Sequence, residues 1–480
     1  MTATSRLVEI HAAAVAFLDA AFDALTELRV VPTSIYHPYL EVGRDYEGNA
    51  VMFLKEFRDL EAVLNQAFPE RFDEEKAHFA SDFSSHWMYS LLEAAVANCS
   101  IRGEDLSSSS YAVEETIAEL ITVLSEPEAH VLVCRAVPHL TTADGQELSI
   151  CDLEILPDVD GRERIPRLIP LGASAFNREP PFVFDPPEAL VVARGNGPDP
   201  YRTAGEASAR IDTFLLAIHL LYASTAWTAY EVEGPASLVD PTGARLTTAS
   251  RGSGNVRRTL RLAPEHGSPI DALSAMLSVA LDVPDEMMFT SFGMAISRFT
   301  ESYLSDKWDA QLLSLTTALE GAVSGTDTTD VLLRLKTRAA ALLSEPDDPA
   351  SAIFEDISKI PDLRSSLAHG GSYKVARFTR SVHQISTVPE AAPLGVAVGH
   401  LIDRLRDIVR RSILARLCLS SLPTPLWILD DDKGVDACLA DDATRSAWRA
   451  AWRTCLVEIG APESAMRASQ AVDFLSREDR

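Results

Sequence analysis

The residues with the clearest chemical potential in this chain lie between Asp362 and Gly371, in the segment DLRSSLAHGG. Arg364 is a permanent cation whose planar guanidinium can donate two hydrogen bonds to one phosphate. His369 is the type of side chain that most readily exchanges a proton near neutral pH. An arginine that neutralises phosphate charge and a histidine that moves a proton suit the cleavage of an RNA strand.

The spacing of this pair is not specific by itself. An arginine precedes a histidine with four to six residues between them at five places in the chain. Pro264 interrupts the pair Arg261 to His266, and the acidic segment FDEEKA lies within the pair Arg71 to His78. The pair Arg6 to His11 opens the N-terminal helix, and the pair Arg377 to His383 follows the two glycines in a loop-like stretch. Context therefore favours the pair in DLRSSLAHGG.

Segments with helical periodicity surround this pair. Apolar residues recur at spacings of three and four along residues 308–323, 331–343 and 401–419. Each pattern gives a helix with one apolar face, and such faces are buried against one another. We therefore expect a small helical bundle around the Arg/His pair.

This succession of segments resembles the HEPN domains, and most closely their Apea-like branch. The similarity covers about residues 287–420. It implies an all-helical bundle that usually forms a homodimer, in which two Arg/His motifs make one composite, metal-independent endoribonuclease site. Such domains recur in toxins and anti-phage defence proteins, so an antitoxin or a phage trigger is a further expected partner. The similarity rests on AQLLSLTTALEGAV (310–323), RAAALL (338–343), ISKIPDLRSSLAHGG (357–371) and LIDRLRDIVRRSILARL (401–417).

The resemblance implies catalytic roles for four residues. Arg364 and His369 match the Arg/His motif, Ser365 occupies the polar position beside the arginine, and Glu320 matches the acidic residue of the ALE segment. His369 would take the proton from a ribose 2′-hydroxyl, whose oxygen then attacks the neighbouring phosphorus, while Arg364 stabilises the phosphate charge. Pro361 departs from the pattern, in which an aromatic or apolar residue precedes DLR.

Other interpretations of the motif stay open at this point. Arg364 could cap helix carbonyls, with His369 a helix-terminal residue ahead of a glycine C-cap. The bundle could also be a catalytically inactive HEPN domain that dimerises and binds a nucleotide or a partner. On one helix, Arg364 and His369 diverge by about 140°. Two copies of the motif, facing each other in a dimer, would bring these groups together more readily.

The charges are unevenly distributed along the chain. Its 43 Lys and Arg against 70 Asp and Glu give a net charge of −27, which argues against a general nucleic-acid binder. Residues 364–416 contain nine basic and three acidic residues, net +6, which leaves −33 for the rest. A basic zone of this kind fits one structured or presented RNA, whereas the alternative is a solvated arginine face with i,i+3 and i,i+4 ion pairs. The expected RNA contacts are Lys374, Arg404, Arg410 and Arg411.

The expected fold class is α+β and mainly α. Residues 1–284 combine helical periodicity with β-like runs and are expected to form a mixed module that senses a trigger or selects the RNA. Residues 285–420 are expected to form the bundle, and residues 421–480 a short helical tail. The β-like runs are 130–140, 147–156, 183–192 and 252–262.

Composition excludes several other classes of protein. No apolar run approaches the ~20 residues of a membrane span, and acidic residues interrupt the apolar N-terminal stretch, so we expect a cytoplasmic protein with no membrane partner. The six cysteines form no CxxC pair and have no histidine at ligand spacing, so we expect reduced core residues and no metal or cofactor. His86 and Trp87, on an apolar helix, are expected in the core.

Overall fold

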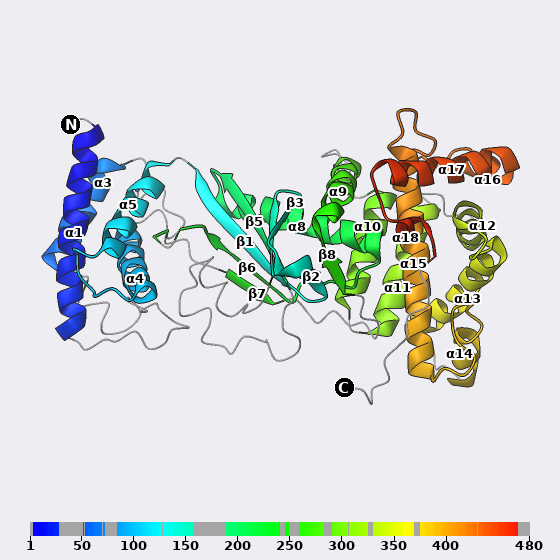
Figure 1. Ribbon diagram of the computed structural model, residues 1–480. Helices are drawn as coiled ribbons and strands as arrows, with labels where there is room; N and C mark the ends of the chain where they lie inside the picture. The colour runs from blue at the N-terminus through cyan, green and yellow to red at the C-terminus, as the bar shows by residue number, and fades with distance from the viewer. Residues whose placement is uncertain are drawn as a thin grey trace.

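The computed structural model places three groups of elements in a row, as Figure 1 shows: helices from the N-terminal part of the chain, a twisted sheet in the middle, and a helical bundle at the far end. The expected α+β, mainly α class is confirmed. The structure describes residues 3–27, 51, 53–69, 71–72, 84–126, 128–157, 189–237, 239–240, 245–248, 259–282, 290–305, 307–324, 330–368, 375–429 and 431–468.

The N-terminal helices bury a core of their own. Apolar side chains such as Phe17, Leu60 and Trp87 lie inside it. Trp87 is buried as expected, but the expectation for His86 was wrong, because His86 is exposed. Neighbouring residues on a helix point about 100° apart, so one can be buried while the next faces solvent. These helices are α1 (Ala3–Glu27), α3 (Lys55–Ala67), α4 (Ser84–Arg102) and α5 (Tyr111–Ser125).

The central sheet has the strand order β3-β4-β5-β1-β6-β7, and all its pairings are antiparallel. Its strands alternate between two apolar faces: Val131 and Val133 belong to the large core, whereas Leu132 and Cys134 belong to a smaller cluster on the opposite face. The strands are β1 (Ala129–Val137), β3 (Leu148–Ile150), β4 (Leu153–Pro157), β5 (Ala189–Gly197), β6 (Tyr230–Pro235) and β7 (Arg245–Thr248).

Short elements complete the region of the sheet. Strands β2 (Leu140–Thr142) and β8 (Leu260–Leu262) form a separate parallel pair. The 3₁₀ turn η2 (Ala143–Gly145) follows β2, and a second such turn, η3 (Pro264–His266), precedes α9. Helix α8 (Pro200–Tyr222) packs on β5 and β1. It starts at Asp199, whose carboxylate accepts hydrogen bonds from the backbone N–H groups of Tyr201 and Arg202.

The bundle is built around α15, the long helix that Figure 1 shows running vertically among the others. Every residue of α15 from Arg404 to Leu419 is buried, which identifies it as the central helix. The segment around Arg377, expected as a loop, forms helix α14 instead. The helices are α9 (Gly267–Leu281), α10 (Ser291–Leu304), α11 (Trp308–Val323), α12 (Val331–Leu343), α13 (Ala350–Ala368), α14 (Val375–Val382), α15 (Leu394–Ser420), α16 (Val435–Ala440), α17 (Asp442–Glu458) and α18 (Glu463–Met466).

One hydrophobic core extends from the sheet into the bundle. It includes Val191 of β5, Phe214 of α8, Leu273 of α9 and Leu315 of α11. The expected boundary at residues 284–285 lies outside the described residues, and the division of the chain into 1–284, 285–420 and 421–480 stays a prediction. Within the described part of the chain, no helix has both the length and the apolar character for a membrane span.

The cysteines follow the expectation in part. All six are free thiols. Cys99, Cys134 and Cys418 are buried, whereas the other three are half-buried at the edges of the core. The core assignment is therefore confirmed for three of the six.

A glycine sets the closest approach between α10 and α11. A Cβ atom at Gly321 would lie 2.5 Å from the carbonyl oxygen of Ser291 and 3.1 Å from the Cβ of Ala295. We predict that Gly321→Ala forces the two helices apart and lowers the free energy of unfolding by about 1 to 3 kcal/mol. Gly205→Ala on α8, where an added Cβ meets nothing within 4 Å, should instead stabilise by up to about 1 kcal/mol. Urea unfolding of both variants measures this, and equal shifts would contradict it.

Candidate active site

The Arg/His motif lies at the end of α13. Arg364 and Ser365 belong to the last part of this helix, which ends at Ala368, and the structure describes their backbone only. His369 and Lys374 lie outside the described residues. The structure therefore locates the motif by its helix.

Glu320 faces a small cavity between three helices. The cavity has a volume of about 180 Å³ and is lined by α11, α12 and α13, with Ile357 and Ile360 contributed by α13. Position 364 follows these two by seven and four residues, so it falls on the same face of α13. Glu320 on α11 and position 364 on α13 thus belong to helix faces that meet. Of the four expected catalytic residues, Glu320 is the one whose side-chain surroundings the structure describes.

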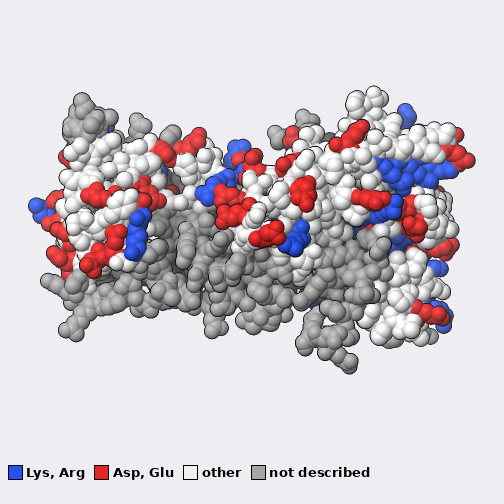
Figure 2. All heavy atoms as spheres, viewed as in Figure 1, with Lys and Arg blue, Asp and Glu red and all other residues white. Residues whose placement is uncertain are grey.

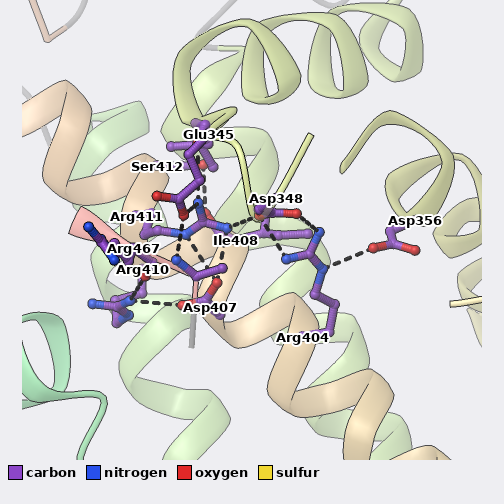
Figure 3. A network of polar contacts seen from close by, with 12 residues as sticks. Glu345, Asp348, Asp356, Arg404, Asp407, Ile408, Arg410, Arg411, Ser412 and Arg467 are labelled. Atoms are coloured by element: carbon purple, nitrogen blue, oxygen red, sulfur yellow. Dashed lines mark hydrogen bonds and ion pairs between the residues drawn. The ribbon is translucent and has the colours of Figure 1, made fainter. Parts of the chain in front are cut away.

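The expected RNA contact Arg404 is instead buried inside the bundle (Figure 3). Its guanidinium donates to both carboxylate oxygens of Asp348, at 2.7 and 2.9 Å, and to Asp356 at 2.9 Å. Asp356 also accepts hydrogen bonds from the backbone N–H and the hydroxyl of Ser386, at 2.7 and 2.6 Å. Arg404 thereby joins α15, α13 and the connection between α12 and α13.

Arg411 is fully buried and belongs to the same network. It donates to Asp348 at 2.5 Å and to Asp407 at 3.0 Å, and also to the carbonyl oxygen of Leu343. Figure 3 shows these side chains converging between the helices. Arg411 thus ties α15 to the end of α12.

Arg410 points toward a different part of the structure. It donates to Asp407 at 2.8 Å and to the carbonyl oxygen of Leu220, at the end of α8, at 2.9 Å. Weaker bonds reach the carbonyl oxygens of Ser464, Ala465 and Arg467 around α18. Arg410 thereby holds α8 and α18 against α15.

These contacts correct the prediction that Arg404, Arg410 and Arg411 bind RNA. Their side chains are at most 5% exposed, and every guanidinium nitrogen except Nε of Arg410 donates to a carboxylate or carbonyl group of the protein. The alternative of a solvated arginine face is also wrong, although the i,i+3 and i,i+4 pairs with Asp407 that it implied are present. Periodicity shows which residues share a helix face but not whether a second layer covers that face.

Asp348 and Asp407 remain ionised. Burial alone would raise the pKa of Asp348, but hydrogen bonds and charge from Arg404 and Arg411 outweigh it and hold the pKa below its ordinary value. Burial would likewise raise the pKa of Asp407, yet Arg411 and Arg410 lower it well below the usual range. The network is thus a set of paired charges, and its role in the site is to position α13.

We predict that Asp348→Asn costs about 3 to 5 kcal/mol of the free energy of unfolding, because Arg404 and Arg411 each lose one of their two buried aspartate partners. Glu206→Gln is the matched control, because Glu206 forms an exposed i,i+4 pair with Arg202 on α8. That pair should contribute within about 0.5 kcal/mol. Urea denaturation at pH 7 gives both values. An Asp348→Asn variant as stable as the control would show that the network does not hold the bundle.

Among the described histidines, His219 is deeply buried and has a shifted pKa. Its ring stacks on Tyr303, with centroids 4.0 Å apart, and Arg406 lies 4.3 Å from the centroid of the same tyrosine. Its Nε2 donates to the carbonyl oxygen of Ala226 at 2.7 Å. Burial, aided by the charge of Arg406, lowers the pKa of His219 to about 4. With the ring at 3% exposure, this histidine is a packing residue rather than a candidate base.

The low pKa of His219 predicts a pH-dependent stability. Between pH 6.5 and 4 the unfolded chain binds a proton that the folded protein rejects, so stability is full above pH 6.5 and falls by on the order of 3 kcal/mol toward pH 4. We predict that His219→Gln loses this part of the decrease, whereas His11→Gln at the exposed His11–Glu114 contact keeps it. Unfolding free energies at pH 7 and 4.5 test this, and identical decreases in all three proteins would contradict it.

Comparisons with known proteins add no assignment. No family model matches the chain, and no curated protein or solved structure matches it either. Over the residues that the structure describes, no three or more His, Cys, Asp or Glu side chains gather as a metal site. The acidic partners Asp348 and Asp356 escaped sequence analysis because they lie 48 to 63 residues before the arginines they bind.

Proposed function

We propose that this chain is a metal-independent endoribonuclease of HEPN type. In this proposal His369 takes the proton of a ribose 2′-hydroxyl and Arg364 stabilises the charge that gathers on the phosphate. The observation that supports it is the place of the motif: α13 carries Arg364 in its last part and ends at Ala368, directly before His369. A helix end in a bundle is exposed enough to receive a strand and rigid enough to fix the reacting groups.

Glu320 and Ser365 have positioning roles in this proposal. Glu320 lies on the face of α11 that meets the face of α13 carrying position 364. A carboxylate there can orient the guanidinium of Arg364 through charge-assisted hydrogen bonds. If the helix continues to His369, Ser365 shares a helical face with it, four residues earlier, and supplies a hydroxyl beside the phosphate.

The proposal includes a homodimer through the bundle. Arg364 and His369 are five residues apart and diverge by about 140° if the helix continues. A two-fold symmetric pair of motifs brings the arginine of one subunit to the histidine of its partner. The paired motifs then form one composite surface. In this proposal an antitoxin covers that surface, or a phage-derived trigger makes it accessible.

We predict that purified wild-type protein cleaves RNA in excess EDTA and leaves 5′-hydroxyl ends, because the neighbouring 2′-oxygen displaces the 5′-oxygen. Arg364→Ala and His369→Ala should each reduce cleavage by at least 100-fold, the scale of a lost general base or charge stabiliser. RNA carrying 2′-deoxyribose at the cut positions should resist cleavage. Sequencing of RNA 5′ ends measures all of these results. In cells, growth arrest should follow expression of the wild type and not of His369→Ala.

The double variant Arg6→Ala/His11→Ala is the matched control. It removes an arginine and a histidine with the same five-residue separation, from a helix of the N-terminal group, and should cleave like the wild type. Cleavage that needs added magnesium would contradict the proposal. A dimer that binds RNA without cleaving it would assign the chain to the inactive, binding type of HEPN protein.

Mixing variants tests the composite site. In a heterodimer of Arg364→Ala with His369→Ala, one of the two sites keeps an intact arginine and an intact histidine if these come from different subunits. The mixture should therefore regain part of the activity that each variant lacks alone. A mixture as inactive as its components would show that each site draws both groups from one subunit.

A further inference from the structure

Helix α17 carries a row of three arginines along one side. Arg445, Arg449 and Arg453 are spaced at four-residue intervals, so successive guanidinium groups start about 6 Å apart along the helix. All three are partly exposed. Figure 2 shows Lys and Arg atoms forming a band along the side of α17 that faces α12. We call these three residues the α17 stripe.

Neighbouring residues of α17 fix this stripe in place. Trp448, Trp452 and Leu456 form the buried row of the helix, and the arginines border that row. Arg449 donates from Nε to the carbonyl oxygen of Ala341, and Arg453 donates from one terminal nitrogen to that of Ser344, at 3.3 Å. These acceptors lie at the C-terminal end of α12, where carbonyl groups have no partner within their own helix. The guanidinium groups of Arg449 and Arg453 are therefore each held through one nitrogen, and each keeps further N–H donors. Arg445 donates to the carbonyl oxygens of Leu439 and Ala440 and to Asp442.

Carboxylates neutralise the stripe only in part. Arg445 pairs with the exposed Asp442, and the charge of Glu345 acts on Arg453. Arg449 has no carboxylate at ion-pair distance among the residues the structure describes. Burial lowers the pKa of Arg449, and the positive charges of Arg445 and Arg453 lower it further because they repel its guanidinium. An added anion would relieve this repulsion.

We propose that the α17 stripe is a phosphate track that binds the backbone of an RNA strand away from the cleavage motif. The spacing of its arginines is comparable to the separation of successive phosphates in a nucleic-acid strand, and each guanidinium can fork onto one phosphate. Both tryptophans of the helix are buried, so no base-stacking surface accompanies the charges. The track therefore reads charge and spacing, with no sequence preference.

The stripe lies at a distance from the motif. Only residues 344–349 connect α12 to α13, so these two helices are antiparallel neighbours. The first residues of α12, Val331 and Leu332, line the same cavity as Ile357 and Ile360 of α13. The motif at the end of α13 is thus near the start of α12, whereas the stripe lies at its end, roughly 20 Å away for a helix of this length. A strand must be several nucleotides long to reach both.

RNA fits this surface better than an acidic protein does. The inference rests on the proposed function, which already requires the chain to hold an RNA strand. In addition, a protein with a net charge of −27 repels acidic proteins and RNA alike at long range. A regular row of guanidinium groups offsets that repulsion best for a ligand that carries one anionic group per repeating unit, as an RNA strand does. An acidic polypeptide as the true ligand is an outcome of the test below.

The test measures binding of a labelled single-stranded RNA of mixed sequence, long enough to span the ~20 Å estimated for α12, to the full-length His369→Ala protein. Fluorescence anisotropy over a range of salt concentrations gives affinity and salt dependence. Arg445→Gln/Arg449→Gln/Arg453→Gln should weaken binding at least tenfold and flatten the salt slope by about 2, at roughly 0.7 per lost contact with a single strand. Replacing the same three residues by lysine should restore most of the slope.

Two controls separate binding from charge and stability. The first, Arg202→Gln/Arg261→Gln/Arg298→Gln, removes the same charge from exposed, carboxylate-paired arginines elsewhere and should bind like its parent. The second adds charge without removing a hydrogen bond: Ala450→Glu, exposed beside the stripe, should weaken binding, and Ala450→Gln should not. The Ala450 pair keeps the test decisive even if the triple variant melts at a lower temperature.

Three outcomes would overturn the track: unchanged affinity in both Ala450→Glu and the triple variant, equal loss in the control triple variant, or displacement of RNA by polyglutamate as effective as by unlabelled RNA. The proposed endoribonuclease function is judged separately, by cleavage in the wild type. Cleavage with no effect of the stripe on binding would overturn only the track. Binding through the stripe without cleavage would overturn only the endoribonuclease.

Discussion

The bundle depends on the neutralisation of buried arginine charge along α15. Moving an ion out of water costs several kcal/mol unless partners replace its hydration. Arg404 and Arg411 share Asp348, and Arg410 and Arg411 share Asp407, so the loss of one carboxylate would remove an ion pair from two buried cations at once. The helices that supply these partners therefore have one arrangement in which every charge is paired.

This network contributes more to the positions of the helices than to the stability of the fold. A well-packed hydrophobic set of similar volume often stabilises a fold as much as a buried ion pair does, whereas an ion pair is satisfied in only one geometry. Asp356 receives Arg404 and Ser386 together, and it lies on α13 eight residues before Arg364. The network thus fixes α13, the helix that carries the proposed catalytic motif, both in its rotation about its axis and in its position along that axis. Precise placement is what a proton transfer and a phosphate contact require.

Sequence periodicity predicted the helices well and the environment of their side chains poorly. The bounds expected for α11 and α12 agree with the structure, because a single apolar stripe over four turns is a strong local signal. Strand β6 was missed because it is short and pairs with β1, which is distant in sequence. Helix α14 was missed because it has only eight residues and follows a glycine pair. In α15, LIDRLRDIVRRSILARL has the charge spacing of a solvated helix. The partners that bury it come from segments dozens of residues away, which no local pattern contains.

Charge counted along a sequence is therefore a poor guide to charge on a surface. Residues 364–416 carry a net charge of +6, yet five of the seven basic side chains that the structure describes there are buried. Buried cations face internal anions and contribute little field to an approaching ligand. Arginines held by backbone carbonyls differ, because a carbonyl accepts a hydrogen bond without cancelling the charge. Arg449 and Arg453 are held in this way. The side of α17 that carries Arg449 and Arg453 is thus basic, whereas the charges of Arg404 and Arg411 are neutralised inside the bundle by aspartates.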